Sequence, residues 1–170
     1  MVTMQVLPNR EDWLKHRTKI GGSDASAILG KNPYKTNVEL WKDKAFHLMP
    51  EDISDKEVVR FGKESEAAIR RLFALDFPQY KVTYDEFGMI ANEPDCPFIF
   101  ATLDGELTDS DGRKGILEIK TTEVRRSLDR KKWDGQVPDY YYAQIVHQLL
   151  ATGYDFAILK ARIRERGEYG

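Results

Sequence analysis

Two short stretches decide the fold of this chain: Ala-Thr-Leu-Asp-Gly-Glu at residues 101–106 and Gly-Ile-Leu-Glu-Ile-Lys at residues 115–120. Each falls within a strand-like run that is bounded by turn residues. Alternate side chains of a strand share a face, so Glu118 and Lys120 point to one side and the apolar residues around them to the other. The second strand therefore holds a carboxylate beside an ammonium group.

The turn between the two strands decides which residues face each other. If Ser110-Asp111-Gly112 is a three-residue loop with its glycine in the left-handed conformation, Asp104 lies opposite Glu118. A two-residue turn at Asp111-Gly112 shifts the register by one and puts Asp104 on the other face. Opposed residues have Cβ atoms roughly 4.5–5.5 Å apart, so the first turn lets two carboxylates hold one divalent cation. The alternative is a solvated, ion-paired hairpin.

A third carboxylate, Glu66, falls on the apolar face of a long helix expected from about Asp55 to about Phe77. Apolar positions in this segment recur every three or four residues, as on one face of a helix. Burying an unpaired carboxylate costs several kcal/mol, so Glu66 requires a cation, a hydrogen-bond donor or a helix that drifts out of phase. The alternative is a narrow apolar stripe with Glu66 at its edge.

Another helix is expected over residues 138–153, with glutamines beside its apolar face. That face is expected to consist of Ala143, Val146 and Leu150. Gln144 and Gln148 lie one turn apart beside it. Either amide can orient a lysine, a water or a phosphate, or satisfy backbone groups at the edge of the core. His147, in the same helix, is expected to be structural.

The remaining elements complete a mixed α/β pattern. Short helices are expected over residues 10–18, from an N-cap at Ser23 to Gly30, and from Thr36 to about His47. Strands are expected over residues 80–90, 98–107, 115–121 and 156–163. Antiparallel pairing of the first three makes a meander, so the pattern predicts an α/β fold with a central sheet.

The composition of the 170 residues is that of one folded domain, expected to span residues 1–170. Apolar residues make up 41% and charged residues 32%, which excludes a disordered chain. The net charge of −2 excludes DNA binding driven by bulk positive charge. The sequence stops directly after an expected strand, which is the pattern of a chain truncated at its C-terminus.

A cytoplasmic setting without membrane attachment is expected. A single cysteine, Cys96, cannot form an intramolecular disulfide or a four-cysteine metal site. No window approaches the roughly 18 apolar residues of a membrane span, and the first residues lack a signal-peptide core.

Five motifs occur together in an order that resembles a known family. They are Ile20-Gly-Gly-Ser-Asp24, Gly62-Lys-Glu-Ser-Glu66, Leu103-Asp-Gly105, Glu118-Ile-Lys120 and Ala143-Gln144. From about residue 10 to about residue 160, the sequence resembles the YqaJ-type viral recombinase nucleases. These are relatives of the phage lambda exonuclease within the PD-(D/E)xK superfamily. The resemblance implies a restriction-endonuclease-like core, with a central mixed sheet, an antiparallel meander and flanking helices.

The resemblance also implies roles for the residues of these motifs. The implied ligands of one or two Mg²⁺ or Mn²⁺ ions are Asp104, Glu118, Glu66 and the backbone carbonyl of Ile119. Lys120 would position or activate the attacking water, and Gln144 would help to orient Lys120. Oxygen ligands favour these metals over zinc, for which the sequence has no set of His and Cys.

A DNA end has a predicted binding site near the N-terminus. Ser23 is expected to cap a helix whose first amides suit an anion, and Arg17 lies within reach. Similar enzymes hold the terminal 5′-phosphate with an arginine and a serine at matching places; the alternative is an ordinary N-cap. Residues 113–132 hold eight basic and three acidic residues, which fits a surface that tracks phosphates. Trp133 beside them is able to stack on DNA, although core packing is the alternative.

The resemblance implies a metal-dependent DNA exonuclease of phage or prophage origin. It would digest double-stranded DNA from 5′ to 3′ and leave a 3′ single strand for a single-strand annealing protein. Relatives form rings that enclose DNA, which implies a homo-oligomeric ring. A CRISPR-adaptation type nuclease with an iron–sulfur cluster is excluded by the single cysteine. The alternative from another class is a catalytically silent module that binds DNA ends or proteins on the same fold.

Overall fold

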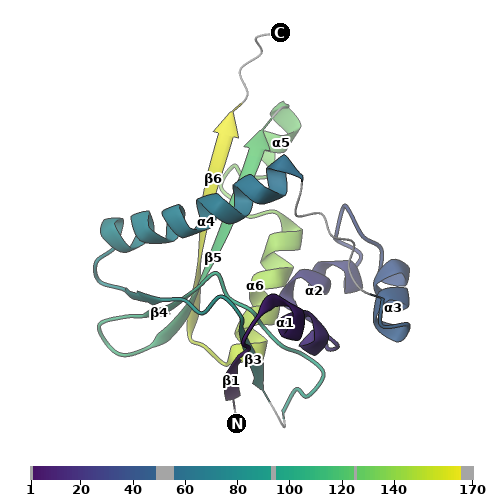
Figure 1. Ribbon diagram of the computed structural model, residues 1–170. Helices are drawn as coiled ribbons and strands as arrows, with labels where there is room; N and C mark the ends of the chain where they lie inside the picture. The colour runs from purple at the N-terminus through teal and green to yellow at the C-terminus, as the bar shows by residue number, and fades with distance from the viewer. Residues whose placement is uncertain (1, 49–55, 93–94, 125, 166–170) are drawn as a thin grey trace.

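The computed structural model describes residues 2–48, 56–92, 95–124 and 126–165 (Figure 1). These ranges contain, in chain order, β1 (Val2–Val6), α1 (Arg10–His16), α2 (Gly22–Ile28), α3 (Asn37–Ala45), α4 (Glu57–Asp76), β2 (Lys81–Thr83), β3 (Gly88–Asn92), β4 (Gly105–Thr108), β5 (Lys114–Val124), α5 (Ser127–Lys131), α6 (Asp139–Thr152) and β6 (Phe156–Glu165). None of the helices in them combines the length and the apolar character needed to cross a membrane.

The central sheet is mixed, as expected. Its four strands lie in the order β2-β4-β5-β6. β4 pairs antiparallel with β2 and with β5, whereas β5 and β6 are parallel. β1 and β3 form a separate antiparallel pair. The α/β class with an antiparallel meander is therefore confirmed, and the meander consists of β2, β4 and β5.

Two of the expected strands are interrupted. Residues 80–90 form two strands, β2 and β3, that join different sheets. In residues 98–107, only the segment from Gly105 is part of a named strand. Before it, Ile99 and Ala101 form isolated bridges with Ile20 and Ile90. The segment thus ties the N-terminal region to the sheet before it enters β4.

The hairpin between β4 and β5 has the three-residue loop. Gly112 adopts a positive φ of 81°, and the Asp109 backbone N–H donates to the Arg113 carbonyl at 3.1 Å. Gly105 pairs with Leu117 in the β4–β5 ladder. Continuing this register by one residue sets Asp104 opposite Glu118, so the predicted register is confirmed.

Helices α4 and α6 contact opposite faces of the sheet. Leu117 and Ile119 of β5 pack against Ile69 and Phe73 of α4 in the largest buried apolar cluster. Glu118, which points to the other side, is hydrogen-bonded by glutamines of α6. Figure 1 shows α4 running across β5 and β6. The alternation along β5 therefore separates an apolar face from a polar one.

The prediction of the apolar face of α6 is wrong for two of its three residues. Ala143 is buried, but Val146 and Leu150 are 47% and 55% exposed. The buried positions include His147, whose Nε2 is 3.0 Å from the Phe100 carbonyl, and Gln148. The helix turns polar groups inward because the sheet face that it covers is itself polar.

Candidate active site

Asp104 and the middle of β5 are joined by a direct hydrogen bond. The Ile119 backbone N–H donates to Asp104 Oδ2 at 2.8 Å. Asp104 precedes β4 by one residue, and this bond holds its side chain against β5 in place of a ladder pair. The hairpin register thus brings Asp104, Glu118 and Ile119 together.

Glu118 is a buried carboxylate with three donors. The residue is 1% exposed. Its Oε1 lies 2.5 Å from Lys120 Nζ and accepts from Gln144 Nε2 at 2.8 Å. Its Oε2 accepts from Gln148 Nε2 at 2.8 Å. A buried carboxylate is tolerated only when its charge and its lone pairs are satisfied, and these three groups do so.

Gln148 also binds Glu118, although Gln144 is the only glutamine of this helix that was predicted to belong to the site. It is 1% exposed, and its Oε1 has no hydrogen-bond partner in the part of the chain that the structure describes. Its position one turn after Gln144 was the usable signal. A Cβ at Gly22 would lie 3.2 Å from Cγ of both glutamines, so this glycine lets α2 approach α6 closely.

Glu66 is half-buried and has a cationic partner. Its Oε1 accepts from Arg70 Nη2 at 2.7 Å, one turn later on α4. Val59, nearer the start of the expected stripe, is 36% exposed, whereas Ile69 is 7% exposed. Only the second half of the apolar stripe, from Ile69 on, is therefore buried in the core. Glu66 lies just before this buried half, at the boundary with solvent.

Burial and neighbouring negative charge raise the pKa values of Asp104 and Glu66. Burial, followed by the neighbouring charges of Glu118 and Glu66, raises the pKa of Asp104 well above its ordinary value. Burial also raises the pKa of Glu66, and the charge of Arg70 partly offsets this effect. The acids repel because the surrounding positive charge does not fully compensate them. A bound divalent cation would remove this repulsion.

The donor chemistry of the site fits Mg²⁺ or Mn²⁺. Asp104 and Glu118 supply carboxylate oxygens from adjacent positions of the hairpin, and backbone carbonyls supply further hard ligands. Within the described residues, no three His, Cys, Asp or Glu side chains are grouped closely enough to hold a metal by themselves. A metal at this site therefore requires main-chain or water ligands besides the two carboxylates, and Glu66 stands farther out.

The two predicted phosphate-binding residues, Arg17 and Ser23, lie in different surroundings. Arg17 follows α1, and its guanidinium carbon lies 4.5 Å from the Trp13 ring centroid and 6.0 Å from that of Phe100. Burial lowers the pKa of Arg17. Among the described residues, no carboxylate lies within ion-pair distance of it. A Cβ at Gly21 would lie 2.8 Å from the Phe100 ring, so this ring borders both Arg17 and the start of α2.

The prediction that Ser23 is an N-cap is wrong. Gly21 is the N-cap of α2, and its backbone N–H donates to Asp24 Oδ2 at 3.0 Å. Ser23 is the second residue of the helix, with an exposed side chain. Lys44 Nζ, 3.0 Å from the same Asp24 oxygen, also donates to the carbonyls of Arg17 and Lys19. A capped and braced loop therefore leads from Arg17 into α2.

Many side chains of the basic segment have acidic partners. Carboxylates pair with Arg113, Lys114, Arg130 and Lys132. Arg125 lies outside the described residues. Trp133 is half-buried, with its ring 5.7 Å from that of Tyr141, which favours packing over stacking on DNA. Lys120 Nζ lies 5.0 Å from the centroid of the same Tyr141 ring.

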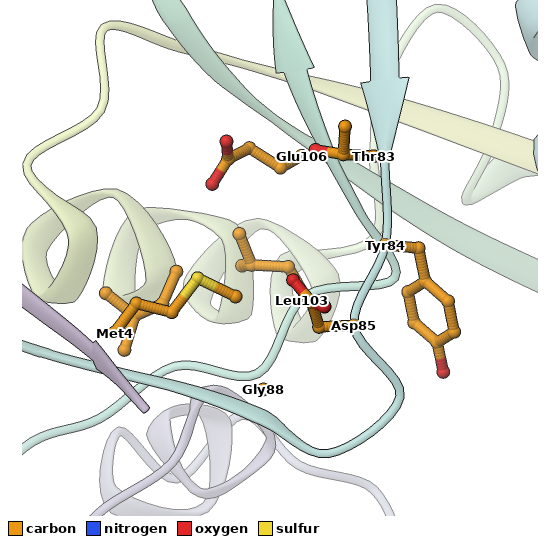
Figure 2. Close-up of a pocket in the computed structure, with 8 residues that line it drawn as sticks. Met4, Thr83, Tyr84, Asp85, Gly88, Leu103 and Glu106 are labelled. Atoms are coloured by element: carbon orange, nitrogen blue, oxygen red, sulfur yellow. The ribbon is translucent and has the colours of Figure 1, made fainter. Parts of the chain in front are cut away.

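A pocket beside the sheet does not add a second site. Its lining comes from Met4, Thr83, Tyr84, Asp85, Gly88, Ile90, Leu103 and Glu106 (Figure 2). The Glu106 carboxylate already accepts hydrogen bonds from Lys114 Nζ, at 2.6 Å, and from the Tyr154 hydroxyl, and neither of these residues lines the pocket. Figure 2 shows the Tyr84 ring on the opposite side of its chain segment from Met4 and Leu103.

Comparison with known sequences decides the family. The profile of the YqaJ-like viral recombinase domain matches residues 12–155. The chain belongs to this family. The YqaJ-like match contains every residue of the candidate active site. A similar relative is the uncharacterized protein YqaJ of Bacillus subtilis (strain 168), 37% identical over 150 residues. The match covers 87% of this chain and 44% of that protein, so the chain spans less than half the length of its relative.

Solved structures share the fold of this YqaJ-like domain. The alkaline exonuclease LHK-Exo from Laribacter hongkongensis superposes with a TM-score of 0.67 at 19% identity, over 91% of this chain and 74% of that chain. LHK-Exo in complex with dAMP gives 0.65 at 20% identity, over 89% and 73%. The YqaJ-like domain therefore has the PD-(D/E)xK restriction-endonuclease-like fold.

Proposed function

We propose that this chain is a single nuclease domain that degrades double-stranded DNA from 5′ to 3′ with Mg²⁺ or Mn²⁺ and leaves 3′ single-stranded ends. The observation that carries the proposal is Glu118, whose buried carboxylate is held by Lys120 and two glutamines beside Asp104. Family membership and a fold shared with an alkaline exonuclease support it.

The residues that would hold one or two divalent ions are Asp104, Glu118 and the carbonyl of Ile119, with Glu66 at the edge. When bound, the cation neutralises phosphate charge and lowers the pKa of a coordinated water. Gln148 holds Glu118 Oε2 from the buried side, while Gln144 reaches Oε1. The two amides thus fix the carboxylate plane by separate oxygens.

Lys120 is the group proposed to act on the attacking water. Its side chain is 20% exposed and its Nζ lies 2.5 Å from Glu118 Oε1, so Lys120 lies between the buried carboxylate and solvent. From there the ammonium group can orient the water and lower the pKa of that water. Gln144 positions Lys120 indirectly, because both donate to the same carboxylate oxygen.

The DNA end is proposed to bind through its 5′-phosphate at Arg17 and Ser23. Arg17 is a cation packed on aromatic rings, which leaves its N–H groups available to an anion. Ser23 offers an exposed hydroxyl at the second position of α2. The dAMP complex of LHK-Exo supports a nucleotide ligand for this fold. A ring of several copies, a single-strand annealing partner and a cytoplasmic setting stay predictions.

Arg17→Ala is expected to slow the digestion of 5′-phosphorylated duplexes about tenfold or more. A hydrogen bond between charged groups contributes about 1.5–3 kcal/mol, which corresponds to that change in rate. Duplexes with 5′-hydroxyl ends should be digested by the variant and the wild-type protein at the same rate. The measurement is the initial rate on the two substrates. Equal slowing on both ends would contradict the phosphate pocket.

Digestion of a linear duplex labelled at either end tests the proposed function as a whole. With Mg²⁺, label at the 5′ ends is expected to appear first as mononucleotide, while label at the 3′ ends stays in long single strands. EDTA should abolish the reaction, and Mn²⁺ should restore it. Fragments of intermediate length from the start would indicate an endonuclease. Binding without cleavage under all conditions would indicate the silent module, and cleavage in EDTA would refute the metal site.

A further inference from the structure

Arg70 connects three separate segments around the acidic site. Its side chain is 13% exposed. Nη2 donates to Glu66 Oε1 at 2.7 Å, and Nε donates to the backbone carbonyl of Asp104 at 2.5 Å. The guanidinium carbon lies 3.5 Å from the centroid of the Tyr84 ring. One side chain thereby joins α4, the residue before β4 and the segment after β2.

This arrangement differs from an ordinary ion pair along a helix. Exposed Glu and Arg side chains one turn apart contribute little, because water screens them. Here the guanidinium is shielded by Tyr84, and its second hydrogen bond leaves the helix for the main chain at Asp104. A planar guanidinium can bind two acceptors in different directions while stacking on a ring, which an ammonium group cannot do.

The Arg70 guanidinium, which does not bind the metal itself, therefore holds two acidic residues of the site. Asp104 precedes β4 and has no ladder partner of its own, so the bond to its carbonyl fixes the main chain from which the carboxylate projects. The bond to Glu66 fixes the second carboxylate relative to that main chain. Without Arg70, both acids would repel each other with no shared anchor.

We infer that Arg70 is a positioning residue, which fixes Glu66 and the main chain at Asp104 relative to each other and so prepares the acidic site for a divalent cation. This inference rests on the proposed function. Partners that orient metal-binding groups typically change metal affinity by about 10–100-fold when they are removed. Arg70 should therefore act on the affinity for the metal, and through it on cleavage.

The test is direct Mn²⁺ binding, followed by electron paramagnetic resonance of the free ion. Arg70→Met keeps the apolar stem and removes the donors. Its dissociation constant for Mn²⁺ is expected to rise about 10–100-fold. Cleavage should shift to higher Mn²⁺ concentration in parallel and recover at saturation. Arg71→Met, the next residue along the helix and exposed, is the matched control and should bind Mn²⁺ like the wild-type protein.

Circular dichroism and the melting temperature separate this role from a purely structural one. If Arg70→Met does not fold, Arg70→Lys takes its place, and an affinity loss in that folded variant supports the inference. Unchanged Mn²⁺ affinity in a folded Arg70 variant overturns it, as does a slow rate that saturating Mn²⁺ does not restore. A wild-type protein that neither binds Mn²⁺ nor cleaves DNA would overturn the proposed function as well.

Discussion

Lys120→Ala is expected to slow DNA cleavage by about 10²–10⁴-fold while DNA binding persists, the usual range for loss of a group that handles a proton. Lys120 Nζ contacts the buried Glu118 and borders solvent, and the proposed mechanism has it orient the attacking water there. Removing the ammonium group leaves that water without its donor. Single-turnover cleavage at saturating Mg²⁺ measures the chemical step, and a gel shift in Ca²⁺ measures binding.

Lys114→Ala is the matched control for this variant. Lys114 lies on the same strand and on the same side of β5, but it pairs with Glu106 at the other end of the hairpin. Its removal should leave the single-turnover rate within about twofold of the wild-type rate, since a surface ion pair contributes little. Unchanged turnover in Lys120→Ala would remove Lys120 from the mechanism. A parallel loss of binding would make it a binding residue instead.

The hairpin that carries the site was predictable because local chemistry fixes it. Gly112 favours the left-handed conformation, and Asp109 accepts hydrogen bonds from the backbone N–H groups of Asp111 and Arg113, both at 2.9 Å. These interactions lie within five residues of chain. The register then places Asp104 opposite Glu118 without any information from the rest of the fold.

The start of α2 shows why a cap is harder to assign than a helix. Ser23 is a good N-cap residue, but Gly21 takes the cap because Asp24, three residues later, closes a hydrogen bond to its N–H. Both serine and glycine are acceptable caps, and the acid decides between them. The strand β1 was missed although its Val-Thr-Met-Gln-Val sequence alternates, since all five residues are exposed and pair only with β3.

The contacts of Arg70 and Gln148 could not be predicted from the sequence because their partners are distant in the chain. Gln148 meets Glu118 thirty residues away, and Arg70 meets Asp104 thirty-four residues away. An arginine on a helix is most often exposed, and a glutamine beside an apolar face is most often at the edge of the core. Only the packing of α4 and α6 on opposite faces of the sheet brings these side chains to the acids.

Asp104→Asn is expected to lower cleavage by at least about 10²-fold and, without metal, to raise the melting temperature. Asparagine keeps an oxygen that can accept from the Ile119 N–H, but it removes a charge that burial, Glu118 and Glu66 all disfavour. The raised pKa means that the folded protein binds this proton more tightly than the unfolded chain does. Stability from this group is therefore present at low pH and is lost as the pH rises through the raised pKa.

Melting curves of the metal-free proteins from pH 4 to pH 8 measure this difference. The wild-type protein should lose stability with rising pH relative to Asp104→Asn, and a gain of about 1 kcal/mol corresponds to about 2–4 °C for a chain of this size. Adding Mg²⁺ should stabilise the wild-type protein more than the variant, because the ion favours the charged carboxylate.

Asp109→Asn provides a control of opposite sign in the same hairpin. Desolvation raises the pKa of Asp109, but hydrogen bonds from Arg113 and Asp111 outweigh it and lower the pKa overall. This variant should lose melting temperature at neutral pH and keep its cleavage activity. A different result, in which Asp104→Asn is also less stable than the wild-type protein without metal, would contradict the prediction. It would mean that Glu118 and Glu66 do not destabilise the charged form of Asp104, and the electrostatic argument for a bound cation would fail.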